Sequence, residues 1–201
     1  FVDKLDQFDL VIFDRYRRQV VLPMAYLRNV ARYVAEGGAV LIASGPEYAQ
    51  ADGLYETPLS EVIPAPPTGR VLEGAFRPSL TAEGHKHPVT RGLPGNGDGG
   101  DAVWGRWFRV IDALPERGMQ VMAGGADGSK PLLILSHEGK GRIAQLLSDQ
   151  GWLWARGYDG GGPQSELLRR IAHWLMQEPD LEEEALNGHQ EAGRLVIERR
   201  T

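Results

Sequence analysis

Ser44 is the residue of this sequence whose type and position come nearest to a nucleophile. It follows the apolar run Ala39–Ala43 in "GGAVLIASGPEYA", which is typical of a buried strand that ends at a tight turn. Many α/β enzymes hold a reactive side chain at such a turn. A serine elbow needs small residues two positions before and two after the nucleophile, because the turn is crowded. Ile42 and Pro46 occupy those positions here, so the pattern does not match.

A serine nucleophile also needs a base, and histidine is the usual one. None of the five histidines has a sequence position that predicts contact with Ser44. They are His85 and His87 in a segment without a regular pattern, His137 in a hairpin turn, His173 in a helix and His189 in the tail. We therefore expect Ser44, Gly45 and Asp149 to mark a vestigial site without catalysis. A hydrolase that uses Ser44, or a water activated by Asp149, is the alternative.

Three carboxylates each come just after a predicted strand. They are Asp14, Glu47 and Asp149. Because the carboxyl ends of parallel strands meet at one edge of an open α/β sheet, we expect these side chains to share a binding site. There they would hold a cation or repel anions. Capping of neighbouring helix N-termini is the other interpretation.

The stretch "SDQGWLWARGYDGGG" brings aromatic rings and an arginine to the same edge. Such a group suits a sugar, a planar ligand or a partner protein. We expect Trp154, Arg156 and Tyr158 to contribute to binding, and Trp152 to pack beneath the loop as core. The alternative is that Trp154 also belongs to the core and that Arg156 forms a local ion pair.

The sequence gives little indication of a metal site or a cofactor site. His85 and His87 lie two residues apart near Glu83, but side chains of an irregular segment need not converge on one ion. The glycines of "GGADGSKP" lie between two strands, whereas a dinucleotide-binding loop joins a strand to a helix. We therefore predict no metal ion and no cofactor.

Composition excludes several classes of function. The net charge of −5 disfavours nucleic acid as a partner, because binding to phosphates needs a clustered cationic surface. The absence of cysteine excludes disulfides, thiolate catalysis and cysteine-bound zinc. No apolar run approaches the roughly 20 residues of a membrane-spanning helix.

The elements that must position these residues follow from hydrophobic periodicity. The first half predicts a strand at Leu10–Phe13, a helix that begins near Pro23 and ends at Gly37-Gly38, and a strand at Ala39–Ala43. This β-α-β unit predicts a parallel, right-handed crossover. Regular signals then fade from Gly45 to about Gly118, where we expect a short helix at Leu59–Ile63 and a flexible loop at Gly92–Asp101. An apolar, partly buried stretch follows, with Trp104, Trp107, Phe108 and Val110.

The second half predicts further strands and one more helix. The expected strands are Met119–Ala123, Pro131–Ser136 and Gly141–Ser148, the last two as an antiparallel hairpin, before a helix at Gln164–Met176. The acidic segment Glu178–Asn187 reads as helical or loose, and "RLVIERR" alternates like a strand without a local partner. The fold class is therefore α/β, a three-layer sandwich whose flavodoxin-like sheet is mostly parallel with an added antiparallel hairpin.

Several segments together resemble a known family. They are "DLVIFDRY", "YVAEGGAVLIASGPEYA", "LYETPLSEVIP", "HPVTRGL" and "GKGRIAQLLSDQGWLWARG…LLRRIAHWLM". In this order they resemble the glutamine amidotransferase-like domain of bacterial membrane-anchored proteins, within the class I glutamine amidotransferase superfamily. The resemblance implies a flavodoxin-like fold. It also implies a triad of Cys, His and Glu, and here Ser44 or Gly45 fills the Cys position and no His follows the strand that ends at Ser148.

We therefore expect a non-catalytic amidotransferase-like domain at residues 1–178 that serves in ligand binding, protein binding or assembly. Residues 179–201 would form an acidic tail and the start of a following segment. The resemblance implies a parent in the bacterial inner membrane, anchored by segments outside this chain, with this domain in solution on the periplasmic side. A carbohydrate-binding module is a third possibility, because the chain also resembles a trehalose-utilisation family that shares this scaffold and the "HP-T-GL" motif.

Overall fold

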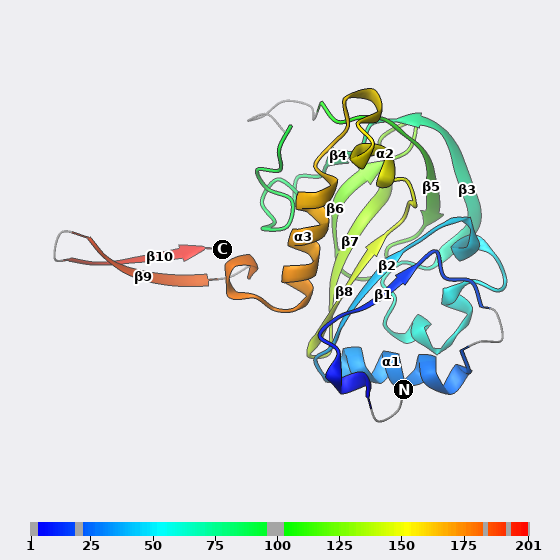
Figure 1. The fold of residues 1–201 in the computed structure, drawn as a ribbon, viewed down its shortest axis with the longest axis horizontal. Helices are drawn as coiled ribbons and strands as arrows, with labels where there is room; N and C mark the ends of the chain where they lie inside the picture. The colour runs from blue at the N-terminus through cyan, green and yellow to red at the C-terminus, as the bar shows by residue number, and fades with distance from the viewer. Residues whose placement is uncertain (1–3, 19–21, 96–102, 183–184, 192–193, 201) are drawn as a thin grey trace.

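The computed structural model describes residues 4–18, 22–95, 103–182, 185–191 and 194–200 (Figure 1). Its centre is a six-stranded sheet with the order β1-β2-β8-β7-β6-β4. The strands are β1 (Val11–Asp14), β2 (Ala39–Ala43), β4 (Ser79–Leu80), β6 (Met119–Gly124), β7 (Lys130–Glu138) and β8 (Gly141–Leu146). The first three in the sheet are parallel, and the pairings of β8, β7, β6 and β4 are antiparallel. Four of the six strands therefore run in one direction, as a mostly parallel sheet requires.

The β1-α1-β2 unit confirms the predicted parallel crossover. Helix α1 (Met24–Glu36) begins directly after Pro23, whose missing N–H costs nothing at a helix start. It ends at Gly37, which has φ of 131° and donates its N–H to the carbonyl of Val34. A side chain on Gly38 would lie 2.3 Å from the ring of Tyr33, so a second glycine lets the chain turn closely into β2.

The second predicted half is also confirmed in its main elements. The β7–β8 hairpin is antiparallel with Ser136 opposite Ile143, and helix α3 (Gln164–Leu175) buries Leu167, Ile171, Trp174 and Leu175. Helix α3 and α1 both contact β2 and β8. The short helix α2 (Trp152–Ala155) follows β8 and packs against α3. The α/β class is confirmed, and a three-layer sandwich stays a prediction.

The expectation of a region without strands between Gly45 and Gly118 is wrong. Two long strands, β3 (Pro67–Phe76) and β5 (Trp107–Ala113), form a separate antiparallel sheet there. Most of β3 is exposed or half-buried and its register shifts twice, so its sequence lacks the alternation that marks a regular strand. The predicted short helix is a single 3-10 turn at Pro58–Glu61. Part of the predicted loop at 92–101 lies outside the described residues.

The C-terminal strand has a partner, which corrects a second expectation. Strand β10 (Arg194–Arg200) pairs in antiparallel register with β9 (Ala185–Glu191), and neither strand joins the main sheet. The sequence "ALNGHQE" of β9 is polar and contains Asn-Gly, so it reads as loop rather than strand. The acidic segment before it contains one 3-10 turn at Pro179–Leu181. No helix in the described part of the chain is both long and apolar enough to span a bilayer.

Candidate functional site

Ser44 lies at the turn after β2, at the carboxyl edge of the sheet. Its backbone N–H donates to the carbonyl of Leu146 at 2.8 Å, which fixes the turn against the end of β8. The residue is 2% exposed, and its hydroxyl forms no hydrogen bond within the part of the chain that the structure describes. No base among the described residues therefore forms a hydrogen bond with the Ser44 hydroxyl.

The described histidines lie elsewhere. His137 stands opposite Arg142 at the beginning of β8, whereas Ser44 lies beyond the end of that strand. The rings of His87 and His137 are 5.7 and 5.5 Å from the ring of Trp174 on α3. Nδ1 of His173 lies 2.6 Å from the Glu178 carboxylate, and His85 is exposed. The side chain of His189 lies outside the described residues.

A charged cluster covers the turn that holds Ser44. Arg15 contacts Glu47 at 2.8 Å and Asp149 at 3.4 Å, and Arg109 contacts Asp149 at 3.3 Å. The Asp149 side chain is only 5% exposed, so two guanidinium groups compensate a nearly buried carboxylate. The predicted convergence of Glu47 and Asp149 on one site is thus present, through two arginines rather than a cation. Asp14 is exposed at the end of β1 and joins none of these ion pairs.

The titration of this cluster follows its geometry. The hydrogen bond to Glu47 raises the pKa of Arg15, and the charge of Glu47 adds to this effect. Burial alone would raise the pKa of the Glu47 carboxyl. The hydrogen bond from Arg15, a backbone hydrogen bond and the charges of Arg15 and Arg109 together outweigh burial and hold that pKa below its usual range. Both groups therefore keep their charges at neutral pH.

Gly45 lets the cluster approach the backbone. A Cβ on Gly45 would lie 2.4 Å from Oε2 of Glu47 and 2.9 Å from Nε of Arg15. Any side chain at this position, a cysteine included, would displace the ion pair. Arg15 itself has φ of 48°, a conformation that residues other than glycine rarely adopt. The turn is therefore built around the Arg15–Glu47 pair.

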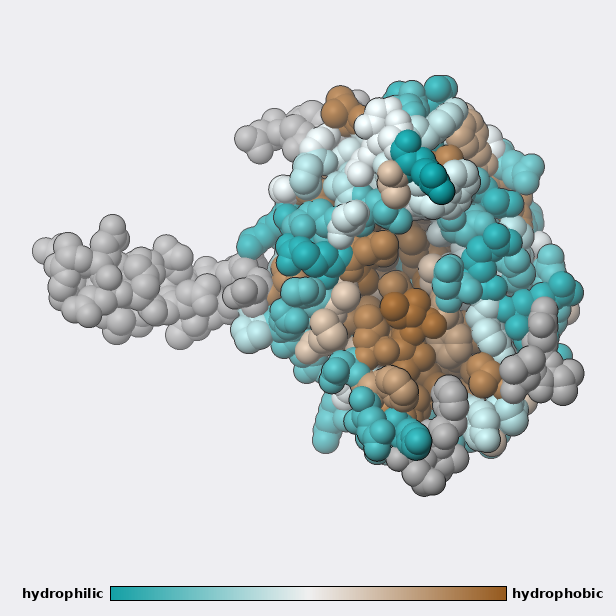
Figure 2. Space-filling view, viewed as in Figure 1, coloured by the Kyte–Doolittle hydropathy of each residue, from teal (hydrophilic) through white to brown (hydrophobic). Residues whose placement is uncertain are grey.

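A groove of about 400 Å³ begins beside this cluster and runs over the sheet. Figure 2 shows its surroundings as one apolar patch on the face that carries β1. Ile12 and Trp152 are each 56% exposed there, and Leu168 of α3 is 37% exposed. The apolar lining comprises Ile12, Leu41, Ala43, Trp107, Leu146, Trp152, Trp154, Leu167 and Leu168, and the polar lining comprises Asp14, Arg15, Ser148, Asp149 and Gln164.

The aromatic stretch after β8 is arranged differently from the expectation. Trp154 is 3% exposed, donates Nε1–H to the carbonyl of Gly105 at 2.7 Å and packs 4.7 Å from the ring of Trp107. Trp152 is the exposed one, so the expectation that it packs as core is wrong. Helix α2 turns these two side chains, two positions apart, in different directions. Tyr158 is 42% exposed and Arg156 is exposed, but neither lines the groove.

Sequence reasoning missed Arg109 and Trp107 as members of the site. Both lie on β5, in the region where regular structure was not expected. The aromatic and β-branched run at Trp107–Ile111 was the available signal, because such residues are enriched in strands. Two side chains of β5 therefore complete a site that the parallel strands begin.

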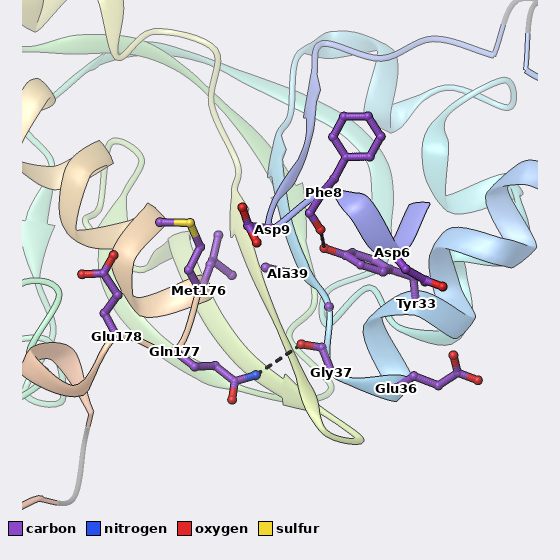
Figure 3. Close-up of a pocket in the computed structure, with 12 residues that line it drawn as sticks. Asp6, Phe8, Asp9, Tyr33, Glu36, Gly37, Ala39, Met176, Gln177 and Glu178 are labelled. Atoms are coloured by element: carbon purple, nitrogen blue, oxygen red, sulfur yellow. Dashed lines mark hydrogen bonds between the residues drawn. The ribbon is translucent and has the colours of Figure 1, made fainter. Parts of the chain in front are cut away.

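A second hollow of about 530 Å³ lies at the opposite end of the sheet, near the start of β2 (Figure 3). Tyr33 donates its hydroxyl to the carbonyl of Phe8 at 2.7 Å, and Gln177 donates to the carbonyl of Gly37. The carboxylates that line it are those of Asp6, Asp9, Glu36 and Glu178. Among the described residues no three His, Cys, Asp or Glu side chains are placed to hold a metal ion. The lining of this hollow contains carboxylates but no serine, threonine, lysine or histidine.

Solved structures of other proteins share the fold of this chain, although no sequence relative was found. No protein-family model matches the chain, and no curated protein matches its sequence. Among solved structures, the cytoplasmic protein STM1381 from Salmonella typhimurium LT2 superposes with a TM-score of 0.69 at 18% identity, over 87% of this chain and 74% of that chain. The mmIFT52 N-terminal domain gives 0.61 at 16% identity, over 88% and 80% of the two chains.

A ThuA-like protein from Parabacteroides merdae ATCC 43184 gives a TM-score of 0.50 at 15% identity, over 85% of this chain and 71% of that chain. These neighbours show that the chain shares the fold of these three proteins, one of which is ThuA-like. At such identities the likeness extends to the fold alone. The chain contains no cysteine, which is consistent with an amidotransferase-like domain that lacks the catalytic triad.

Proposed function

We propose that this chain is a non-catalytic domain on an amidotransferase-like scaffold, which binds a ligand or a protein at the carboxyl edge of its sheet. One observation carries the proposal: the Ser44 hydroxyl is buried and has no hydrogen-bond partner among the described residues, at the position where the scaffold holds a nucleophile. General-base activation needs a heavy-atom distance of about 2.6–3.2 Å. His87 and His137 instead pack on Trp174, and His137 lies opposite Arg142 at the start of β8, whereas Ser44 lies beyond the end of that strand.

The neighbouring charges support the same conclusion. Asp149 is the second residue that chemistry could use, as a base for a water molecule. Its carboxylate already forms ion pairs with the guanidinium groups of Arg15 and Arg109, so these contacts compete with a water molecule for its oxygens. The cluster therefore acts as a rigid charged rim, and the apolar groove beside it supplies the contact area for binding.

A hydrolase assay separates the proposal from the enzymatic alternative. The wild type, Ser44→Ala and Asp149→Asn are incubated with p-nitrophenyl acetate, L-glutamine p-nitroanilide and a fluorophosphonate probe. We expect background rates and no labelling for all three proteins. Turnover in the wild type that Ser44→Ala or Asp149→Asn abolishes would overturn the proposal.

Binding at the groove is tested with an apolar fluorescent probe. 1-Anilinonaphthalene-8-sulfonate should bind the patch, because it carries an apolar ring system and an anionic group that suits Arg15. We expect Trp152→Ala to weaken the fluorescence several-fold. The control is Met119→Ala, which removes a side chain that is 37% exposed and does not line the groove. Equal fluorescence of the wild type and Trp152→Ala would show that this groove is not the binding surface.

Carbohydrate binding is a second candidate, favoured by the exposed indole of Trp152. Its ring lies in a groove that also carries Asp149 and Gln164, and apolar ring faces beside polar groups suit a sugar. A glycan array should then give signals that Trp152→Ala removes and Tyr158→Ala retains. An array without signal for the wild type would reject this candidate.

We also propose that the domain belongs to a larger membrane-anchored bacterial protein and faces the periplasm. The sequence resemblance to amidotransferase-like domains of such proteins supports this placement. Cell fractionation with an antibody against this domain, followed by protease treatment of spheroplasts, tests it. Recovery of the parent in the soluble fraction would reject the anchor, and protection from the protease would reject the periplasmic side.

A further inference from the structure

Trp107 of β5 carries a buried polar atom that lacks a partner. Its side chain is 1% exposed, and its Nε1–H forms no hydrogen bond within the part of the chain that the structure describes. The adjacent Trp154 shows the usual arrangement, because its Nε1–H donates to the carbonyl of Gly105 at 2.7 Å. A buried donor without an acceptor is unfavourable and rare in folded proteins. An oxygen atom of a bound ligand would satisfy this donor.

The polar edge of the Trp107 ring lies next to the groove of about 400 Å³ that this residue lines. A Cβ on Gly151 would lie 3.9 Å from Cζ2 of Trp107 and 3.9 Å from Cγ of Gln164. Cζ2 belongs to the edge of the indole that carries Nε1. Gly151 and Gln164 line the same groove, so the space that Gly151 leaves without a side chain lies beside the unpartnered donor.

Gln164 is the side chain that can uncover this donor. Because Nε1 is buried, a ligand contacts it only when a neighbouring side chain shifts. Gln164 is half-buried at the first residue of α3, and its carboxamide forms no hydrogen bond among the described residues. A change of its rotamer therefore breaks no hydrogen bond. The Trp107 ring is fixed by comparison, since its centre lies 4.7 Å from that of Trp154.

The surroundings of the donor favour a carbonyl oxygen over a hydroxyl group. A hydroxyl would bring a second donor that needs an acceptor of its own. At the polar end of the groove, Ser148 already donates to the carbonyl of Arg109 at 2.7 Å, and Asp149 forms ion pairs with Arg15 and Arg109. A carbonyl oxygen accepts without adding a donor.

Charge favours a neutral ligand over a carboxylate. The described lining carries two carboxylates, those of Asp14 and Asp149, and one cation, Arg15. The remaining lining is mostly apolar, and the indole of Trp152 is 56% exposed. Such a lining suits an apolar molecule with few polar atoms.

We propose that this groove binds a small, uncharged, apolar molecule that carries a carbonyl group, and that Nε1–H of Trp107 donates to the carbonyl oxygen. The site is formed by β5, the start of α2 and the start of α3, which supply Trp107, Gly151 and Gln164. The inference rests on the proposed function and adds the class of ligand to it.

Two matched ligands test the hydrogen bond. 6-Propionyl-2-(dimethylamino)naphthalene is neutral and apolar with one ketone, and 6-propyl-2-(dimethylamino)naphthalene has a methylene group in place of the carbonyl. Fluorescence titration gives the Kd of each. Trp107→Phe keeps an aromatic ring but removes the donor, so it should reduce the preference for the ketone by about five-fold. Lost packing affects both ligands alike, and the ratio of the two Kd values cancels it.

A second variant tests the position of the ligand without changing Trp107. Gly151 has φ of −53° and ψ of −27°, which valine also adopts, so Gly151→Val fills the space beside the donor. It should weaken the binding of both ligands by about ten-fold. Ala155→Val is the matched control, because it adds valine to the same helix at an exposed position outside the groove, and it should bind like the wild type.

The outcomes separate this inference from the function on which it rests. An unchanged preference for the ketone in Trp107→Phe would reject the hydrogen bond but leave binding at the groove intact. Equal affinities of Gly151→Val and Ala155→Val would show that the ligands bind elsewhere and would overturn the inference. If the wild type binds neither naphthalene, both the ligand class and the proposed binding of small ligands at the groove are rejected.

Discussion

The guanidinium of Arg142 lies 5.0 Å from the centre of the Trp174 ring, so the start of β8 and the end of α3 are joined through one cation. The same side chain donates to the carbonyl of Trp174 and to Glu182, each at 2.7 Å. Arg142 is 6% exposed. A buried cation with this set of partners anchors the segment that follows α3 to the sheet.

Replacement of Arg142 should therefore destabilise the fold. Arg142→Met keeps much of the apolar stem but removes the guanidinium donors to the Trp174 carbonyl and to the Glu182 carboxylate, which we expect to lower the free energy of unfolding by about 2–3 kcal/mol. Arg142→Lys should recover little of this loss, because an ammonium lacks the fork geometry of a guanidinium. Urea denaturation gives the free energies.

The control for this prediction is Glu182→Gln, which keeps an acceptor at the same place and should cost less than 1 kcal/mol. Proteolysis provides a second measurement. In Arg142→Met the chain after α3 should be cut faster than in Glu182→Gln. Equal unfolding free energies of Arg142→Met and the wild type would contradict the anchoring role.

Sequence reasoning recovered the elements whose periodicity is strong. The β1-α1-β2 unit, the β7–β8 hairpin and α3 are buried on a clear face, so their apolar residues recur at the expected spacing. Strand β3 was missed because it is half-exposed and irregular, and β9 because its residues are polar. The periodicity of apolar residues reflects burial of one face, so elements with little buried surface show little periodicity in the sequence.

The candidate site was predictable only in part, for a related reason. Glu47 and Asp149 follow parallel strands, so their convergence follows from topology. Arg109 comes from β5, in a separate sheet that the local pattern did not indicate. The orientation of Trp152 and Trp154 depends on one turn of helix, α2, which is too short for its periodicity to show in the sequence. Contacts between distant elements set these positions.

Arg15 should show two opposing effects when it is replaced. Arg15→Ala removes the ion pairs to Glu47 and Asp149 and keeps a side chain at a φ of 48°. Arg15→Gly removes the same ion pairs but relieves the backbone, because glycine adopts positive φ without steric cost. We expect both variants to be less stable than the wild type, with Arg15→Gly more stable than Arg15→Ala by about 1 kcal/mol. Thermal unfolding of the three proteins measures the order, and Arg15→Ala at least as stable as Arg15→Gly would contradict the strain.

Asp112 predicts a pH dependence of stability. Burial would raise the pKa of its carboxyl, but hydrogen bonds from Thr68, Lys130 and Arg70 outweigh burial and lower the pKa to about 2. The folded pKa lies below the unfolded value of about 3.9, so the stabilisation is complete above about pH 5 and is lost as the pH falls toward 2.

We expect this stabilisation to amount to about 2 kcal/mol at neutral pH. Asp112→Asn is the matched variant, and its stability gap from the wild type should narrow by that amount between pH 6 and pH 2. The comparison is needed because Glu166 titrates in the same range. Hydrogen bonds from Arg169 and Arg170 lower its pKa to about 2, and its contribution to the pH dependence of stability is the same in both proteins. A gap that is constant with pH would show that Asp112 titrates normally.

Ser44 gives the last prediction, since its buried hydroxyl forms no hydrogen bond within the part of the chain that the structure describes. Ser44→Ala should be as stable as the wild type or more stable by up to about 1 kcal/mol, because an unsatisfied polar group no longer has to be buried. Ser44→Cys introduces the chain's first thiol at the same place, where the structure supplies no base to form a thiolate. Iodoacetamide should therefore label this variant slowly in the folded state and fully in urea. Ser129→Cys, at an exposed position, should be labelled quickly in both conditions. If the folded Ser44→Cys protein reacts as fast as folded Ser129→Cys, the turn after β2 does activate a nucleophile.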